Sequence, residues 1–131
     1  MKSLTASAAD ADQPGAVVRQ LAALAQSTRL AIFRLLLAHA PDGLTPGAIA
    51  SALSLAPATL SFHLKELASA GLVRDRRESR FIWYQADVTT MTGLVRYLTE
   101  NCCRARRDGR CAPGCAPEAC APTTPRGRST K

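Results

Sequence analysis

The residues with the most distinctive chemistry are five cysteines, and all of them lie in the last thirty residues of this 131-residue chain. Two are adjacent and three follow at intervals: Cys102, Cys103, Cys111, Cys115 and Cys120. Thiolate sulfur is a soft ligand, which selects thiophilic ions over ions that prefer oxygen or nitrogen. The seven residues between Cys103 and Cys111 are long enough to loop back, and closing so short a loop costs only a few kcal/mol. Cys102, Cys103 and Cys111 are therefore a candidate three-sulfur metal site, in which Cys115 or Cys120 could replace Cys111.

Other uses of these cysteines stay open on the sequence alone. Neither a membrane span nor a secretory leader is visible, so we expect a cytoplasmic protein whose thiols are kept reduced. Structural zinc prefers four ligands in closely spaced pairs, which Cys111, Cys115 and Cys120 approach but the adjacent pair does not. A redox switch that pairs Cys102 or Cys103 with a later cysteine is a third hypothesis, and unreactive cysteines are a fourth.

The positive charge is concentrated beside these cysteines. The chain has a net charge of +7 and a pI near 9.7, which favours an acidic partner such as nucleic acid. Four arginines lie between Cys103 and Cys111: Arg104, Arg106, Arg107 and Arg110. Their charges are expected to lower the pKa of the thiols and so raise the thiolate fraction at neutral pH.

The central part of the chain has the spacing of a helix-turn-helix. A helix is predicted over residues 16–25, and Ser27 is expected to cap a second helix. This second helix is apolar on nearly every side, so we expect it in the middle of the core. Thr45 and Pro46 then begin a short helix, and Pro57 begins another after a tight turn. The last of these helices has Leu60, Leu64 and Leu67 on one apolar face and ends near Gly71.

The opposite face of that last helix is typical of a DNA-recognition surface. Thr59 and Ser61 can hydrogen-bond base edges or phosphates, Phe62 can contact a thymine methyl, and Lys65 can neutralise a phosphate. His63, beside the apolar face, is expected to be packed in the protein. The alternative, a merely solvated face, does not account for an exposed Phe62.

A strand-forming hairpin follows directly, with its tip expected at Glu78 and Ser79. Its arginines are expected to reach the DNA backbone or the minor groove, as in the winged form of the motif. Those assigned to DNA contact are Arg76, Arg77 and Arg80. A solvated hairpin is the simpler alternative.

A final helix is predicted from about residue 89 to residue 102. Its apolar stripe, together with the helix at residues 16–25, is the expected surface for homodimer formation, because a dimer reads two DNA half-sites. The stripe consists of Met91, Leu94, Val95 and Leu98. The expected organisation is a flexible arm at residues 1–14, a mainly α domain with a β-hairpin at residues 15–103, and a flexible tail at residues 104–131.

Three segments together resemble the ArsR/SmtB family of winged-helix repressors over about residues 16–101. They are the stretches LAALAQSTRLAIFRLLL, ATLSFHLKELASAGLV and RRESRFIWYQ. The resemblance implies a homodimeric, non-enzymatic repressor that leaves its operator DNA when an inducer binds. The family's Cys-Val-Cys arsenic site is missing, since that position reads LTPGAIA, and so are the Asp and His ligands of its zinc sites.

Some members of that family bind arsenite through adjacent cysteines at the end of the last helix and a third cysteine beyond it. The stretch NCCRARRDGRC is similar to this arrangement. The resemblance therefore implies arsenite, As(III), or the chemically similar Sb(III), as an inducer held by Cys102, Cys103 and Cys111. The alternative is a thiol-redox or zinc/cadmium-responsive repressor of the same family. An enzyme is not expected, because CxxC and phosphate-binding glycine motifs are absent from the sequence.

Overall fold

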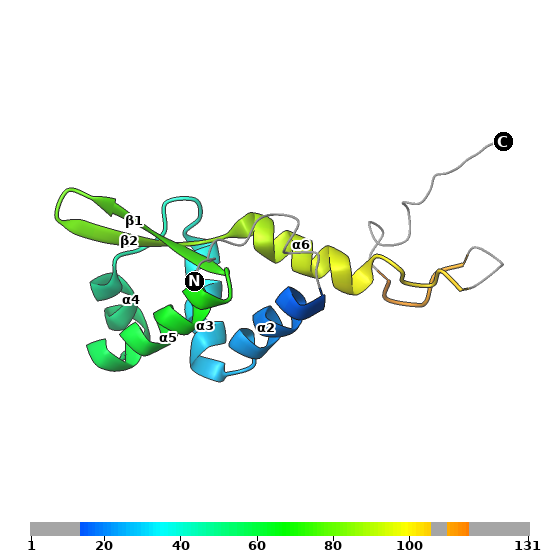
Figure 1. Cartoon of the computed structure of the whole chain (residues 1–131), viewed down its shortest axis with the longest axis horizontal. Coiled ribbons are helices and arrows are strands. Elements are labelled where there is room, and N and C mark those ends of the chain that lie inside the picture. Colours follow the sequence, from blue (N-terminus) through cyan, green and yellow to red (C-terminus); the bar gives the residue numbers. More distant parts are fainter. Residues whose placement is uncertain (1–13, 106–109, 116–131) are drawn as a thin grey trace. The chain divides into compact units, whose positions relative to one another are not determined.

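The computed structural model describes residues 14–105 and 110–115, which fall into two compact units that meet between Leu94 and Val95. Figure 1 shows helices followed by one hairpin and a last helix. The elements are α2 (Pro14–Leu24), α3 (Ser27–Ala38), α4 (Pro46–Leu53), α5 (Pro57–Ser69), β1 (Val73–Glu78), β2 (Phe81–Ala86) and α6 (Val88–Thr99). The mainly α fold with a β-hairpin that the sequence predicts is confirmed.

The core of the first unit lies around α3 and α5. Leu60, Leu64 and Leu67, the predicted apolar face of α5, are all buried. The expectation that α3 is surrounded by the core on nearly every side is wrong, because Leu30 is 43% exposed. Helix α3 instead presents one fully buried edge: Ile32, Phe33 and Leu36.

Helix ends in this unit follow local hydrogen bonding. Thr45 caps α4 as predicted, since its hydroxyl accepts from the Ala48 amide at 3.3 Å. The predicted cap at Ser27 is wrong: the longer Gln26 side chain accepts from the Arg29 amide at 2.9 Å, and Ser27 is already helical. At the end of α5, Gly71 adopts a left-handed φ of 81°, which a side chain would disfavour.

That glycine ends the recognition-type helix in a Schellman motif. The Leu72 amide donates to the Leu67 carbonyl, and the Gly71 amide donates to the Ala68 carbonyl, both at 3.0 Å. Leu72 is fully buried, so the chain leaves α5 in a fixed direction and enters β1 at once. The prediction that this helix ends near Gly71 is confirmed.

Strands β1 and β2 pair antiparallel, with Val73 opposite Ala86 and Glu78 opposite Phe81. The tip is therefore Ser79 and Arg80, one residue later than predicted, with Ser79 at a left-handed φ of 61°. Leu44 forms an additional bridge to Tyr84, whose amide donates to the Leu44 carbonyl at 2.8 Å. This bridge fastens the hairpin to the link between α3 and α4.

The last helix begins one residue before the predicted start and ends earlier than predicted. Asp87 caps it, because its carboxylate accepts from the Thr90 amide at 3.0 Å. It ends at Thr99 instead of residue 102. The Cys102 amide bonds the Thr99 carbonyl three residues back, which tightens the chain into turns. Cys102 and Cys103 consequently lie in a turn beyond the helix.

Within residues 14–105 and 110–115, no single helix has the length and apolar character needed to cross a membrane. Two pairs of consecutive helices, α2 with α3 and α4 with α5, reach that length and composition only when both helices are counted together across a sharp bend. The expected arm at residues 1–14 and tail at residues 104–131 fall mostly outside the residues that the structure describes.

Candidate thiol site and nucleic-acid interface

Helix α5 presents the predicted recognition residues on its exposed face. Thr59, Ser61 and Lys65 are exposed, and Phe62 keeps 55% of its surface open to solvent. The face combines two hydroxyls, one aromatic ring and one cation. Hydroxyls can hydrogen-bond to base edges or phosphates, an aromatic ring can contact a thymine methyl, and a cation can pair with a phosphate.

His63 is buried on the other side of α5, as the sequence predicts. Its Nδ1 lies 3.3 Å from Nη1 of Arg29, and its ring lies edge-on to Phe62 with 5.3 Å between the ring centroids. Arg29 also donates from Nε to the Ala23 carbonyl at 2.7 Å. Arg29 thus links the end of α2 to the middle of α5 and supports the orientation of the exposed face.

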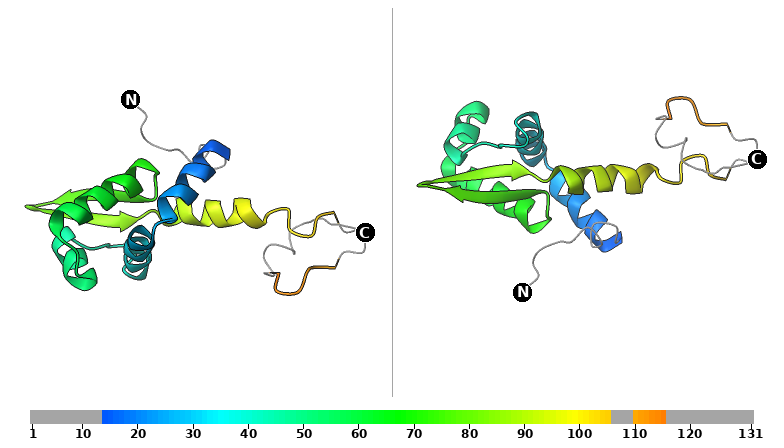
Figure 2. Two further views of the ribbon diagram at one scale, coloured as in Figure 1. Left: turned by 90° about the horizontal axis from the view of Figure 1, so that it is seen from below. Right: turned by 90° about the horizontal axis from the view of Figure 1, so that it is seen from above.

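The arginines of the hairpin that are predicted to contact DNA differ in their exposure and in their contacts. Arg77 and Arg80 are exposed, whereas Arg76 donates from Nη1 to a Glu78 carboxylate oxygen at 2.8 Å and lies 5.8 Å from the Trp83 ring centroid. Figures 1 and 2 show the hairpin tip and α4 at the same end of the first unit. Arg77 and Arg80 are therefore exposed on the hairpin, whereas Arg76 is engaged with Glu78.

Three cysteine sulfurs meet in the turns that follow α6. The Sγ of Cys102 lies 3.6 Å from that of Cys103 and 3.1 Å from that of Cys115, and all three sulfurs lie within 4.8 Å of one another. Cys103 adopts a left-handed φ of 63°. The arrangement is a compact three-sulfur cluster, which we call the thiol cluster (Cys102, Cys103 and Cys115).

The segment that returns to this cluster is held by short-range hydrogen bonds. The Ala112 amide donates to the Cys103 sulfur at 2.9 Å, and the Cys115 amide donates to the Ala112 carbonyl at 3.0 Å in a turn. Gly114, at a left-handed φ of 84°, completes that turn. These bonds position Cys115 beside the adjacent pair.

Cys111, which the sequence interpretation placed in the site, is not among the three sulfurs that the structure brings together. It is engaged in a disulfide, which leaves it without a thiol. The signal that favours Cys115 is the Pro113-Gly114 dipeptide, typical of a turn, immediately before it. Cys120 lies outside the described residues.

The electrostatics of Cys102 differ from the expectation drawn from the neighbouring arginines. Hydrogen bonds with the Cys115 sulfur and then with the Cys103 sulfur raise the pKa of Cys102 to about 12. The expectation that the arginines lower the pKa is therefore wrong for this thiol. Hydrogen bonds between neighbouring sulfurs favour the protonated form of Cys102, and burial adds to the same effect.

The recognition-type helix, the basic hairpin and the helix pair preceding it define a winged helix-turn-helix protein. A family model described as a helix-turn-helix domain matches residues 24–76. The chain is similar to HlyU from Vibrio cholerae N16961, at 33% identity over 64% of this chain and 91% of that one, with a TM-score of 0.53.

Two further solved structures carry family names. One is an ArsR-like transcriptional regulator from Rhodococcus sp. RHA1, at 25% identity over 64% of this chain and 76% of that one, with a TM-score of 0.58. The other is the homodimeric winged helix-turn-helix DNA-binding domain Mb0332 from Mycobacterium bovis, a possible ArsR-family regulator. It shares 34% identity over 66% of this chain and 81% of that one, with a TM-score of 0.52. No curated protein matches the chain. The chain belongs to the ArsR family of transcriptional regulators, which is a family of regulators and not of enzymes.

Proposed function

We propose that the protein is an arsenite-responsive repressor that binds operator DNA as a homodimer in the cytoplasm. In this proposal it releases the DNA when As(III), or Sb(III), binds the thiol cluster. The observation that carries the proposal is the meeting of three cysteine sulfurs within 4.8 Å, in the turns after the last helix. Soft trivalent ions prefer such an all-sulfur donor set over oxygen or imidazole ligands.

The chemistry of arsenous acid fits three thiols. Each of three S–H groups exchanges with one hydroxyl of As(OH)3, so that three As–S bonds form and three water molecules leave. The product is a pyramid with the arsenic lone pair on its open side. It needs three sulfurs close together and no fourth ligand, which is what the thiol cluster offers.

Zinc and cadmium are less well supported. A tetrahedral zinc site with Zn–S bonds of about 2.3 Å requires sulfurs about 3.8 Å apart and a fourth ligand. The separations from Cys102 are shorter, at 3.1 and 3.6 Å. The part of the chain that the structure describes contributes three clustered ligands.

Cys115 is the third ligand in this proposal, and Cys111 is not. The Cys115 sulfur already lies beside Cys102, and its turn is fixed by a backbone hydrogen bond. Cys111 would first have to lose its disulfide, because only a thiol can exchange with a hydroxyl of arsenous acid. A Cys111→Ser variant therefore serves as the matched control for Cys102→Ser and Cys115→Ser.

The DNA contact is assigned to the exposed face of α5 and to the hairpin. Thr59, Ser61, Phe62 and Lys65 would enter the major groove, while Arg77 and Arg80 would contact the neighbouring backbone. Arg76 would support the hairpin through Glu78 and Trp83, with a weaker direct contribution.

Homodimer formation is assigned to apolar side chains that the single chain leaves open. Helix α2 exposes Val18 and Leu21, and α6 exposes Val95 and Leu98, which are 51% and 57% exposed. Exposed apolar residues concentrated on two helices are typical of a subunit interface. The known homodimeric relative supports the same assignment.

Release of DNA follows from the position of the thiol cluster. Cys102 and Cys103 lie in the turns just after α6. An ion that binds these two cysteines together with Cys115 would therefore constrain the end of α6, the helix assigned to the dimer surface. A change in α6 would alter the spacing of the two recognition helices. An allosteric coupling of about 1 to 3 kcal/mol would weaken operator binding by about 5- to 150-fold.

The test is operator binding by fluorescence anisotropy, using a duplex that the wild-type protein selects from a random-sequence pool. Arsenite should release the wild-type protein and the Cys111→Ser variant but leave Cys102→Ser and Cys115→Ser bound. Undiminished arsenite sensitivity in Cys102→Ser would contradict the proposal.

Thiol oxidation is a second candidate, favoured by the separation of 3.1 Å between the Cys102 and Cys115 sulfurs. A peroxide could oxidise the two thiols to a disulfide, with its own oxygens reduced and the two thiol protons leaving in water or alcohol. Mass spectrometry after hydrogen peroxide treatment would detect a Cys102–Cys115 bond. Operator release by peroxide but not by arsenite would favour this function over the first.

A further inference from the structure

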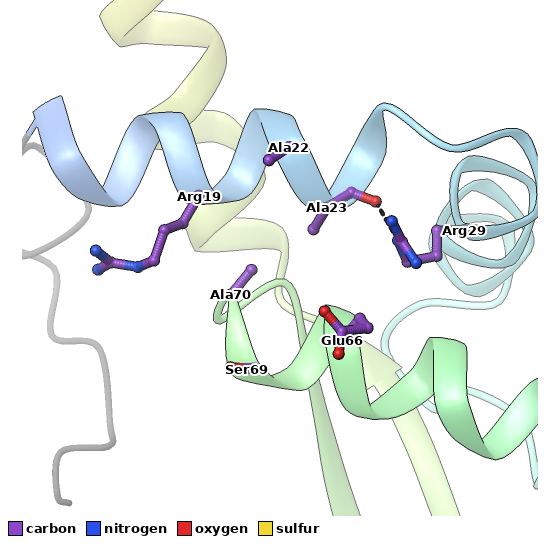
Figure 3. Close-up of a pocket in the computed structure, with 7 residues that line it drawn as sticks. All are labelled: Arg19, Ala22, Ala23, Arg29, Glu66, Ser69 and Ala70. Atoms are coloured by element: carbon purple, nitrogen blue, oxygen red, sulfur yellow. Dashed lines mark hydrogen bonds between the residues drawn. The ribbon is translucent and has the colours of Figure 1, made fainter.

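A small pocket lies between α2, α3 and α5, lined on the α5 side by residues that follow the exposed recognition residues in the sequence (Figure 3). Its volume is about 270 Å³, just below the range of about 300 to 1,000 Å³ that is usual for small-molecule sites. Its walls are mainly small side chains, which leave the space unfilled. The residues that line it are Arg19, Ala22, Ala23, Arg29, Glu66, Ser69 and Ala70.

The charges of this pocket are of both signs. Arg29 is already engaged, because its guanidinium donates to the Ala23 carbonyl and contacts the His63 ring. In Figure 3, Arg19 and Arg29 border opposite ends of the pocket, and Glu66 lies across from α2. Among the described residues no ion pair forms at Arg19 or at Glu66, so one cation and one anion remain available to a ligand.

We propose that this pocket binds a small zwitterion of the α-amino-acid class. The ligand's carboxylate would pair with Arg19, which can donate two parallel N–H groups, and its ammonium would pair with Glu66. A purely anionic ligand would meet the Glu66 carboxylate, and a purely cationic one would meet two guanidinium groups. The small volume and the alanine walls limit the ligand to a short side chain, such as that of alanine or serine.

Such a ligand would bridge α2 and α5. Glu66, Ser69 and Ala70 belong to α5 or its cap, and Arg29 already ties α5 to α2 through His63 and Ala23. Binding would therefore restrain the C-terminal half of the recognition helix. The inference rests on the first unit alone, so it does not depend on the cysteines or on arsenite.

The test is an NMR titration of the full-length protein with L-alanine and L-serine, with acetate and methylammonium as single-charge controls. Amide signals of residues 57–70 should shift with either amino acid, at a dissociation constant of about 1 mM or below. Because both charged side chains are exposed, Arg19→Gln and Glu66→Gln should each weaken binding by about two- to fivefold. Arg34→Gln, an exposed arginine of α3 outside the pocket, should bind as the wild type does.

Equal shifts with acetate or methylammonium alone would overturn the proposal, as would unchanged affinity in both pocket variants. The absence of any shift with either amino acid would also overturn it. The Cys102→Ser variant should bind the amino acid normally, which separates this result from the fate of the arsenite proposal.

Discussion

The thiol cluster should bind arsenite with an affinity that hardly changes with pH, whereas its affinity for zinc should rise steeply as the pH increases. The reaction of As(OH)3 with three thiols forms three water molecules. Each water contains one thiol proton, so the reaction releases no free proton and its equilibrium does not depend on pH. Zinc binds only thiolates, and each protonated thiol must therefore lose its proton when zinc binds. The difference separates the two ions without any need to know the operator.

The magnitude follows from Cys102. Hydrogen bonding with Cys115 and then with Cys103 raises the pKa of Cys102 to about 12, so this thiol holds its proton throughout the neutral range. Below that pKa, zinc binding releases the proton, and Cys102 alone should raise the zinc affinity about tenfold for each pH unit gained. The arsenite affinity contains no such contribution.

The assay is isothermal titration of the reduced protein with arsenite and with zinc, at several pH values between about 6 and 8. The Cys102→Ser variant is the matched control, since it removes the proton in question and one sulfur. An arsenite affinity that rises tenfold per pH unit would refute the reasoning, and so would a zinc affinity that is flat across this range.

Three other changes test the fold and the DNA-binding surface. Leu67→Ala removes a fully buried α5 side chain and should lower the free energy of unfolding by about 2 to 5 kcal/mol in urea denaturation; a loss below about 1 kcal/mol would contradict its place in the core. Gly43→Ala should destabilise the protein in the same assay, because an added Cβ would collide with the Tyr84 carbonyl oxygen and because Gly43 has a left-handed φ of 83°. Wild-type stability in this variant would disprove that close approach. Arg77→Gln should weaken operator binding and reduce the slope of log affinity against log salt concentration by about 0.9. Arg76→Gln should change this slope less, because Arg76 is already paired with Glu78; equal changes in the two variants would contradict the different roles of the two arginines.

Much of the DNA-reading unit could be predicted from the sequence because its signals are local. Thr45 with Pro46 marks one helix start, Pro57 marks another, and Gly71 with Leu72 marks the Schellman end of α5. Each signal acts through hydrogen bonds or backbone angles within a few residues. Periodicity then assigned the buried face of α5 correctly.

The errors arose where several local solutions compete. Gln26 is outside the usual set of capping residues, yet its longer side chain reaches the Arg29 amide, so Ser27 was the wrong prediction. The sequence predicts the end of α6 too late, because the apolar spacing continues to Cys102. In the structure the Cys102 amide donates to the Thr99 carbonyl and closes a turn there.

The thiol cluster shows the limit of reasoning from spacing. Loop length allowed Cys111, Cys115 or Cys120 to meet the adjacent pair, and the choice depends on a turn at residues 112–115 that spacing does not measure. The pKa of Cys102 was misjudged for a related reason. Counting arginines in the sequence gives no weight to sulfur–sulfur hydrogen bonds, which form only after the chain folds back.

The most direct measurement is X-ray absorption at the arsenic edge, on the arsenite-loaded wild-type protein and on the Cys111→Ser and Cys115→Ser variants. We expect three sulfur neighbours and no oxygen or nitrogen in the wild type and in Cys111→Ser, and two sulfurs with one oxygen in Cys115→Ser. Three sulfurs retained in Cys115→Ser but lost in Cys111→Ser would contradict the assignment of the third ligand. An oxygen neighbour in the wild-type protein would contradict the three-thiol site itself.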